Sequence, residues 1–122
     1  MLDLEINEFG RRLGLPGLAL DDNGRAGVRF DDIGMLTLEA GEGSEEDVLR
    51  VVLAVPVEPS DAAVRYDAAL RRVSWRSALP YSVSTALFRD QLIWSVRLPA
   101  RSVTAAALEN ALRFLLDEAA RR

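Results

Sequence analysis

Apolar positions along the chain follow two spacings, one typical of amphipathic helices and one typical of strands. Apolar residues recur three and four positions apart over 2–13, which predicts a first helix. The same spacing returns in two later segments that end near residues 73 and 120, so we predict two further helices. The three stripes are Leu2, Ile6, Phe9 and Leu13; Tyr66, Leu70 and Val73; and Leu108, Ala111, Leu112, Leu115, Leu116 and Ala119.

Residues that start and stop helices flank these stripes. Gly14, with a proline two residues later, is a typical end for the first helix. The second helix has a cap at Ser60 or Asp61, and the third has one at Ser102 or Thr104, because short polar side chains bind the free N–H groups of a first turn.

Five segments between these helices predict strands. Apolar and polar residues alternate over 26–30 and 35–40. The segment 48–57 is apolar on both faces, which favours a central strand or one covered by a helix. Two more strands follow over 83–88 and 92–98.

The connections between strands define the fold class. Residues 31–34 form a hairpin loop, and residues 89–91 are short enough only for an antiparallel hairpin. The order α-β-β-β-α-β-β-α therefore predicts an α+β fold, an antiparallel sheet packed by helices. We expect one domain over 1–122, since the chain has the length of a single domain.

The composition excludes many kinds of chemistry. The chain has no His, no Cys and no Lys, and all 15 of its basic residues are Arg. Imidazole and thiolate metal sites, disulfides, Ser–His and Cys–His nucleophiles, Schiff-base lysines and a P-loop lysine are thereby excluded. We therefore expect no catalytic, metal or cofactor site.

Paired carboxylates are what remains for acid–base chemistry. They occur at Asp21–Asp22, Asp31–Asp32 and Glu45–Glu46. The first pair opens a segment that faintly resembles a calcium loop but has Val and Arg inside it. We expect all three pairs to lie solvated in turns, and a small hydrolase that uses carboxylates is the third hypothesis for the function.

Charge is divided unevenly along the chain. Residues 1–61 carry five Arg against fourteen acids, and residues 62–122 carry ten Arg against five acids, for a net charge of −4. An acidic protein with scattered arginines is a poor nucleic-acid binder, so we expect no nucleic-acid partner. The charged N-terminus does not fit a secretory signal, and the apolar run 48–57 is too short to cross a membrane, so we expect a cytoplasmic protein without membrane insertion.

A few large apolar residues have two interpretations. Trp94 shares a strand face with three apolar residues and is either a core residue or part of an interface. Trp75, between Ser and Arg, favours an interface. Leu4 and Phe114 lie off the apolar stripes of their helices, which modestly favours an apolar docking surface.

Two stretches resemble a known family. The opening EFGRRLGLPGLALDDNG at 8–24, with its Leu-Gly-Leu helix exit, and the closing VRLPA at 96–100 and LENALRFLLDEA at 108–119 are similar to the class I type III secretion chaperones, the Tir-chaperone-like family. The similarity covers nearly the whole chain, and none of these motifs is a catalytic signature.

The resemblance implies a non-enzymatic, cytoplasmic homodimer that needs no cofactor. Such a protein binds the N-terminal segment of a secreted effector and keeps it ready for export. The alternative is a regulatory or heterodimeric secretion component with the same fold and no cargo. The polar stretch 74–84 departs from the family pattern and leaves homodimer and heterodimer both open.

The resemblance also assigns residues to two surfaces. The effector-facing surface would involve the first helix and first strands, with Leu4, Val28, Phe30, Met35 and Leu38 as candidates. The dimer interface would involve the central helix and the strands after it, with Tyr66, Leu70, Val73, Trp75, Phe88 and Trp94 as candidates.

Overall fold

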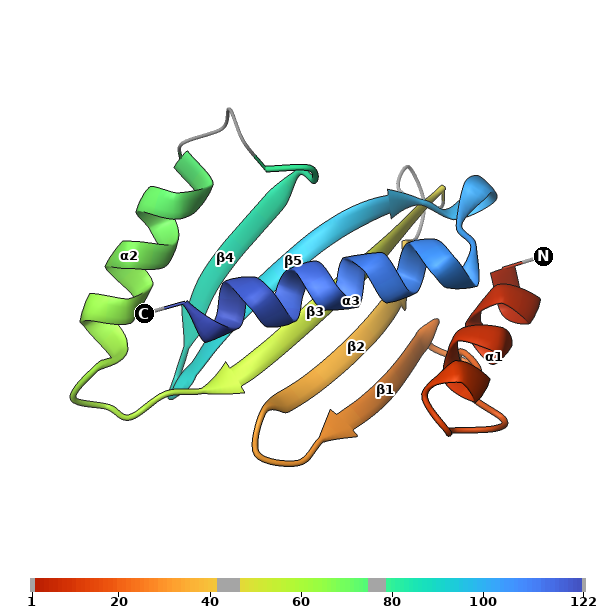
Figure 1. Cartoon of the computed structure of the whole chain (residues 1–122), viewed down its shortest axis with the longest axis horizontal. Coiled ribbons are helices and arrows are strands. Elements are labelled where there is room, and N and C mark those ends of the chain that lie inside the picture. The colour runs from red at the N-terminus through yellow and green to blue at the C-terminus, as the bar shows by residue number, and fades with distance from the viewer. Residues whose placement is uncertain (1, 42–46, 75–78, 122) are drawn as a thin grey trace.

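Three α-helices and one five-stranded sheet make up the computed structural model, which describes residues 2–41, 47–74 and 79–121 (Figure 1). The predicted fold class and the predicted order of helices and strands are confirmed. In chain order the elements are α1 Leu2–Arg12, β1 Arg25–Phe30, β2 Gly34–Ala40, β3 Val48–Pro56, α2 Ala62–Ser74, β4 Val83–Phe88, β5 Gln91–Pro99, the 3₁₀ turn η2 Ala100–Ser102 and α3 Ala105–Ala120.

Strand β3 lies at the centre of the sheet, whose order is β1-β2-β3-β5-β4. All four pairings are antiparallel, and β3 pairs with β5 over its full length, from Val48 opposite Pro99 to Pro56 opposite Gln91. The chain leaves β3 through α2, returns at the edge strand β4 and then places β5 between β4 and β3. The apolar character of 48–57 therefore reflects a strand that is paired on both sides.

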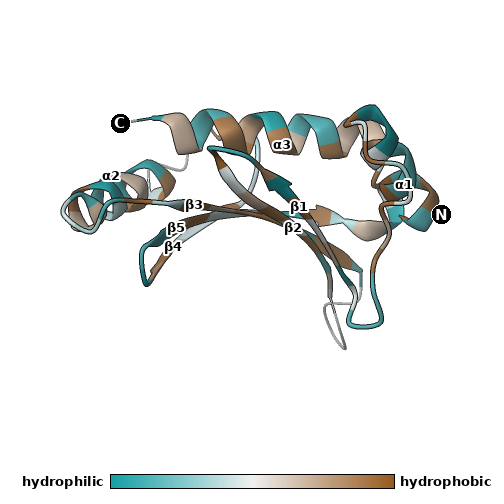
Figure 2. Ribbon diagram, turned by 90° about the horizontal axis from the view of Figure 1, so that it is seen from below, coloured by the Kyte–Doolittle hydropathy of each residue, from teal (hydrophilic) through white to brown (hydrophobic). Residues whose placement is uncertain are grey.

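Helices cover one face of the sheet only. Helix α3 runs across the strands, with α1 beside its N-terminal end on the same side, and α2 lies at the β4 end (Figures 1 and 2). Seen edge-on in Figure 2, the opposite face of the sheet carries no helix among the described residues. We call these the helix face and the open face.

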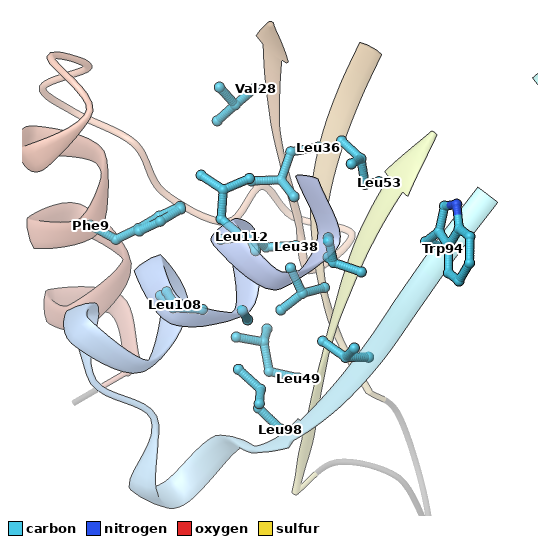
Figure 3. Packing of buried hydrophobic residues seen from close by; sticks show 14 of the residues in the cluster. Phe9, Val28, Leu36, Leu38, Leu49, Leu53, Trp94, Leu98, Leu108 and Leu112 are labelled. Atoms are coloured by element: carbon cyan, nitrogen blue, oxygen red, sulfur yellow. The ribbon is translucent and has the colours of Figure 1, made fainter. Parts of the chain in front are cut away.

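Alternate residues of each strand form the core on the helix face. In β3, Leu49, Val51 and Leu53 are buried, while the residues between them are only half-buried. They meet the stripe of α3 that includes Leu108 (Figure 3) and Leu115, both fully buried. Since a buried leucine contributes about 1.5–3 kcal/mol relative to an exposed one, this layer is the main source of stability.

Polar contacts fix α1 against the start of α3. The Glu5 carboxylate accepts a hydrogen bond from the Ala105 backbone N–H at 2.8 Å, and the Thr104 hydroxyl accepts one from the Ala107 N–H at 3.0 Å. Thr104 is therefore the cap of α3, one of the two candidates from the sequence. Arg12 joins the same helices through an ion pair with Glu109, 2.6 Å between Nη1 and Oε1.

The start of β2 depends on a glycine. A Cβ atom on Gly34 would overlap the backbone carbonyl oxygen of Ala54 on β3. A Cβ atom on Gly27, also in the sheet, would meet only the terminal methyl of Met35, which can move aside. Gly34 therefore allows the backbones of β2 and β3 to approach closely. Gly27 has no such role and serves as the matched control.

We expect Gly34→Ala to lower the free energy of unfolding by about 1–3 kcal/mol, because β2 must move away from β3 to admit the methyl group. Gly27→Ala, the control, should change it by no more than about 0.5 kcal/mol. Urea denaturation followed by circular dichroism measures both values. Equal stability of the two variants would contradict the close approach at Gly34.

Candidate interaction surfaces

Three of the five effector-facing candidates reach the surface. Leu4 on α1 is 71% exposed, and Met35 on β2 is 36% exposed. Phe30 at the end of β1 is half-buried, and Ile33 in the adjoining turn, which the sequence reasoning did not single out, is 42% exposed. Phe30, Ile33 and Met35 all lie near the β1–β2 turn, but Phe30 is on the side of buried Val28 and Met35 is on the open face. Leu4 lies on a different element.

Val28 and Leu38 do not belong to this surface. Both are in the core, 5% and 0% exposed, because they point to the helix face of β1 and β2. Their selection as surface residues was wrong: alternation along a strand separates two sets of residues but does not say which set the helices will cover.

The candidates for the dimer interface divide in the same way. Leu70 and Phe88 are 38% and 58% exposed, and Tyr66 and Val73 are half-buried. Trp94 is 3% exposed on the helix face of β5, so the core interpretation of this residue is correct and its selection for the interface was wrong. Trp75 lies outside the described residues.

Helix α2 packs less tightly than its length suggests. Of its thirteen residues only Ala69 is buried, and Val64 is 74% exposed. It contacts β4 and β5, and β4 is the edge strand on that side. Helix α2 and β4 therefore form an edge of the molecule with apolar side chains that no other described residue covers.

The open face of the sheet carries two rows of side chains that were not predicted from the sequence. The strand register places Met35, Ala54, Ile93 and Ala86 in one row across four strands. A second row, toward the other ends of the strands, consists of Arg25, Glu39, Arg50 and Arg97. The alternation within each strand was visible in the sequence, but the rows appear only once the pairing of the strands is known.

A cavity of about 700 Å³ lies between α2, β5 and the end of α3. Apolar side chains form much of its wall, together with three arginines and two acids. The lining residues are Asp61, Val64, Arg65, Ala68, Ala69, Arg72, Leu92, Trp94, Glu118 and Arg121.

Glu118 is the buried acid of this cavity, with 3% of its surface exposed. Both of its carboxylate oxygens accept hydrogen bonds from Arg72, at 3.0 and 3.1 Å, and Arg121 lies 3.4 Å away. The hydrogen bonds to Glu118 and its charge raise the pKa of Arg72 above its ordinary value. This ion pair joins α2 to α3, since Arg72 and Glu118 belong to different helices.

Trp94 forms the part of the wall contributed by β5, together with Leu92. Its indole Nε1 is buried and has no hydrogen-bond partner among the described residues. A buried donor without a partner costs about 1–3 kcal/mol, and among the described residues no other buried side-chain nitrogen or oxygen lacks a hydrogen bond.

Two of the three acidic pairs considered for catalysis lie in exposed turns. Asp21 and Asp22 are exposed, and the Asp21 carboxylate accepts hydrogen bonds from the backbone of Asn23 and Arg25, at 2.9 and 3.0 Å. Asp31–Asp32 is exposed as well, and Glu45–Glu46 lies outside the described residues. Within 2–41, 47–74 and 79–121, no group of acids is arranged to hold a metal ion, and every helix is too short or too polar to cross a membrane.

Comparison with known proteins gives one family and a set of similar structures. The model of the Tir chaperone protein (CesT) family matches residues 5–121. No curated protein matches the sequence. A chain of the crystal structure of the Yersinia pestis type III secretion chaperone SycH, in complex with a stable fragment of YscM2, is 22% identical with a TM-score of 0.73, over 98% of this chain and 97% of that chain.

Two further complexes have similar chains. One is in the ExsC–ExsE complex, with 26% identity, a TM-score of 0.71 and coverage of 98% of this chain and 88% of the other. The second is in the HopA1–SchA chaperone–effector complex, with 15% identity, a TM-score of 0.72 and coverage of 95% and 88%. The architecture found here is therefore one that occurs in complexes with bound partners.

We expect Glu118→Gln to lower the free energy of unfolding by about 1–3 kcal/mol, because a neutral amide replaces a buried carboxylate that pairs with two arginines. Asp67→Asn is the control, since Asp67 also pairs with an arginine of α2, Arg71, but is 61% exposed. Its effect should not exceed about 0.5 kcal/mol. Chemical denaturation of both variants checks the difference, and an equal loss in the two would contradict it.

Proposed function

Because the chain belongs to the Tir chaperone protein (CesT) family, we propose that it is a type III secretion chaperone that binds the N-terminal segment of a secreted effector and keeps it competent for export. The observation that carries this proposal is the match of the family model to 117 consecutive residues, 5–121, which include every helix and strand but the first turn of α1. The match is thus to the whole fold.

The similar structures support the same function. All three structures are complexes, and two of them include a chaperone: SycH with a fragment of YscM2, and the HopA1–SchA chaperone–effector complex. A non-enzymatic, cytoplasmic role fits a chain with no His, Cys or Lys. Binding of an extended polypeptide requires apolar grooves and free strand edges rather than reactive side chains.

We place the cargo on α1 and on the β1 edge of the sheet. Leu4 offers an exposed apolar side chain on α1, Ile33 and Met35 offer two more at the β1–β2 turn, and Phe30 beside them is half-buried. Among the described residues β1 pairs only with β2. Its outer edge is open to an added strand beyond Arg25, whose backbone N–H and carbonyl bond to Asp21. An effector segment with alternating apolar residues would fit both features.

Copurification tests the chaperone proposal directly. The chain is coexpressed with the tagged N-terminal segment of the protein encoded next to it in a secretion locus. We expect a stable, soluble complex, and the same segment should be degraded or insoluble without the chain. If every secreted protein of that locus fails to retain the chain, the proposal of an effector chaperone is overturned.

Leu4→Ser tests the position of the cargo on α1. Removing an apolar contact of this size should weaken cargo binding about tenfold, as measured by calorimetry. Stability should change little, because Leu4 is 71% exposed. Val64→Ser on α2 is the matched control, since Val64 is 74% exposed and lies outside the proposed cargo surface. Unchanged affinity in Leu4→Ser would remove α1 from this surface.

A second copy of the chain is the partner that we propose for α2 and β4. Helix α2 buries only Ala69 and exposes Leu70, and the adjoining edge strand exposes Phe88. Apolar side chains at an open sheet edge favour association, and a two-fold dimer would cover this edge in both copies.

Leu70→Asp and Phe88→Asp should each convert a dimer to a monomer, because a charge would be buried between the two copies. Light scattering measures the mass, with Leu4→Asp as a control that should remain dimeric. If the unmodified chain is itself a monomer, the homodimer is wrong and the edge is left for a different partner chain.

A further inference from the structure

The cavity between α2, β5 and α3 has the features of a site for a small molecule. Its volume of about 700 Å³ falls within the range of small-molecule sites, and its wall is largely apolar and also contains charged side chains. Val64, Ala68, Ala69 and Leu92 give the apolar part of the wall.

The charges around the cavity favour a ligand with one negative charge. The lining contains three arginines and two acids, an excess of one positive charge. Glu118 is already satisfied by Arg72 and Arg121. Arg65 donates a hydrogen bond to the Ala119 carbonyl at 3.1 Å through one nitrogen, and a guanidinium has further donors to offer.

The Trp94 indole adds a donor within the apolar wall. The side chain is 3% exposed, and its Nε1 has no partner among the residues of 2–41, 47–74 and 79–121. An acceptor atom brought into the cavity would satisfy it. Helix α2 forms the facing part of the wall through Val64, Ala68 and Ala69.

From these observations we propose that the cavity between α2, β5 and α3 binds an aliphatic monocarboxylate. The hydrocarbon chain lies against the apolar wall, and the carboxylate accepts hydrogen bonds from Trp94 Nε1 and from the arginines at the mouth. This site is separate from the proposed cargo surface on α1 and β1. Its occupancy would hold α2 in place against the sheet.

Octanoate serves as the probe, and the Trp75→Phe variant serves as the host protein. This host contains Trp94 as its sole tryptophan, so a single indole N–H resonance reports on the cavity. We expect that resonance to shift saturably with octanoate, well below the concentration at which octanoate self-associates. Octanol, with the same chain and no charge, should bind at least about tenfold more weakly, and octylamine should not bind.

Two variants test the assigned groups by calorimetry. Trp94→Phe keeps an aromatic ring and removes the donor, and Arg121→Gln removes one positive charge from the mouth; each should weaken octanoate binding about tenfold. Arg113→Gln, on an exposed turn of α3 outside the cavity, should leave it unchanged. Arg121 is 58% exposed, so its variant will fold even if Trp94→Phe does not.

Equal affinity for octanol and octanoate would overturn the proposal, as would unchanged octanoate affinity in Arg121→Gln. Every one of these measurements uses the chain without cargo. Their failure would therefore leave the chaperone proposal untouched, and failure of cargo binding would leave this proposal untouched.

Discussion

The apolar stripe of α3 lies across the alternate residues of β3 and β5 that face it, and the other elements are arranged around this contact. Leu108 and Leu115 from the helix and Leu49, Val51 and Leu53 from β3 are almost completely buried together. Because β3 is paired on both sides, a single helix can organise the sheet through its centre. Helix α3 can cover only one face of the sheet. The open face and the α2 edge are therefore left to solvent or to partners. The surfaces proposed for cargo and for a second copy both lie outside this central layer.

Periodicity alone was sufficient to predict which segments form helices and strands. Three- and four-residue spacing marked α1, α2 and α3, and alternation marked β1 and β2, because each element buries one side. The short loop before β5 also indicated its antiparallel pairing with β4. The position of β5 between β3 and β4 was not predictable in this way, since it depends on contacts between residues about forty positions apart, such as Leu53 and Trp94.

Site residues were harder to predict than elements. Val28, Leu38 and Trp94 were assigned to surfaces because they are large, apolar and in the right elements, yet each points into the core. A strand presents two sets of side chains, and the set that becomes buried is decided by the helices, which come from other parts of the sequence. Leu4 was placed correctly on the surface because a helix position off the apolar stripe is exposed whichever partner the stripe finds. The cavity beside Glu118 had no local signal, since it forms between α2, β5 and α3.

The contacts that hold α1 have a consequence for the order of events in folding. Glu5 bonds to Ala105 and Arg12 pairs with Glu109, contacts that span 100 and 97 positions of the chain. Helix α1 ends at Arg12 and α3 begins at Ala105, so on a ribosome α1 is complete long before the helix end that it contacts has been made. The first helix must therefore wait, with Ile6 and Phe9 unburied, until α3 has been synthesised and has packed on the sheet. During synthesis these apolar residues of α1 are thus exposed, the same condition from which the chain is proposed to protect its cargo.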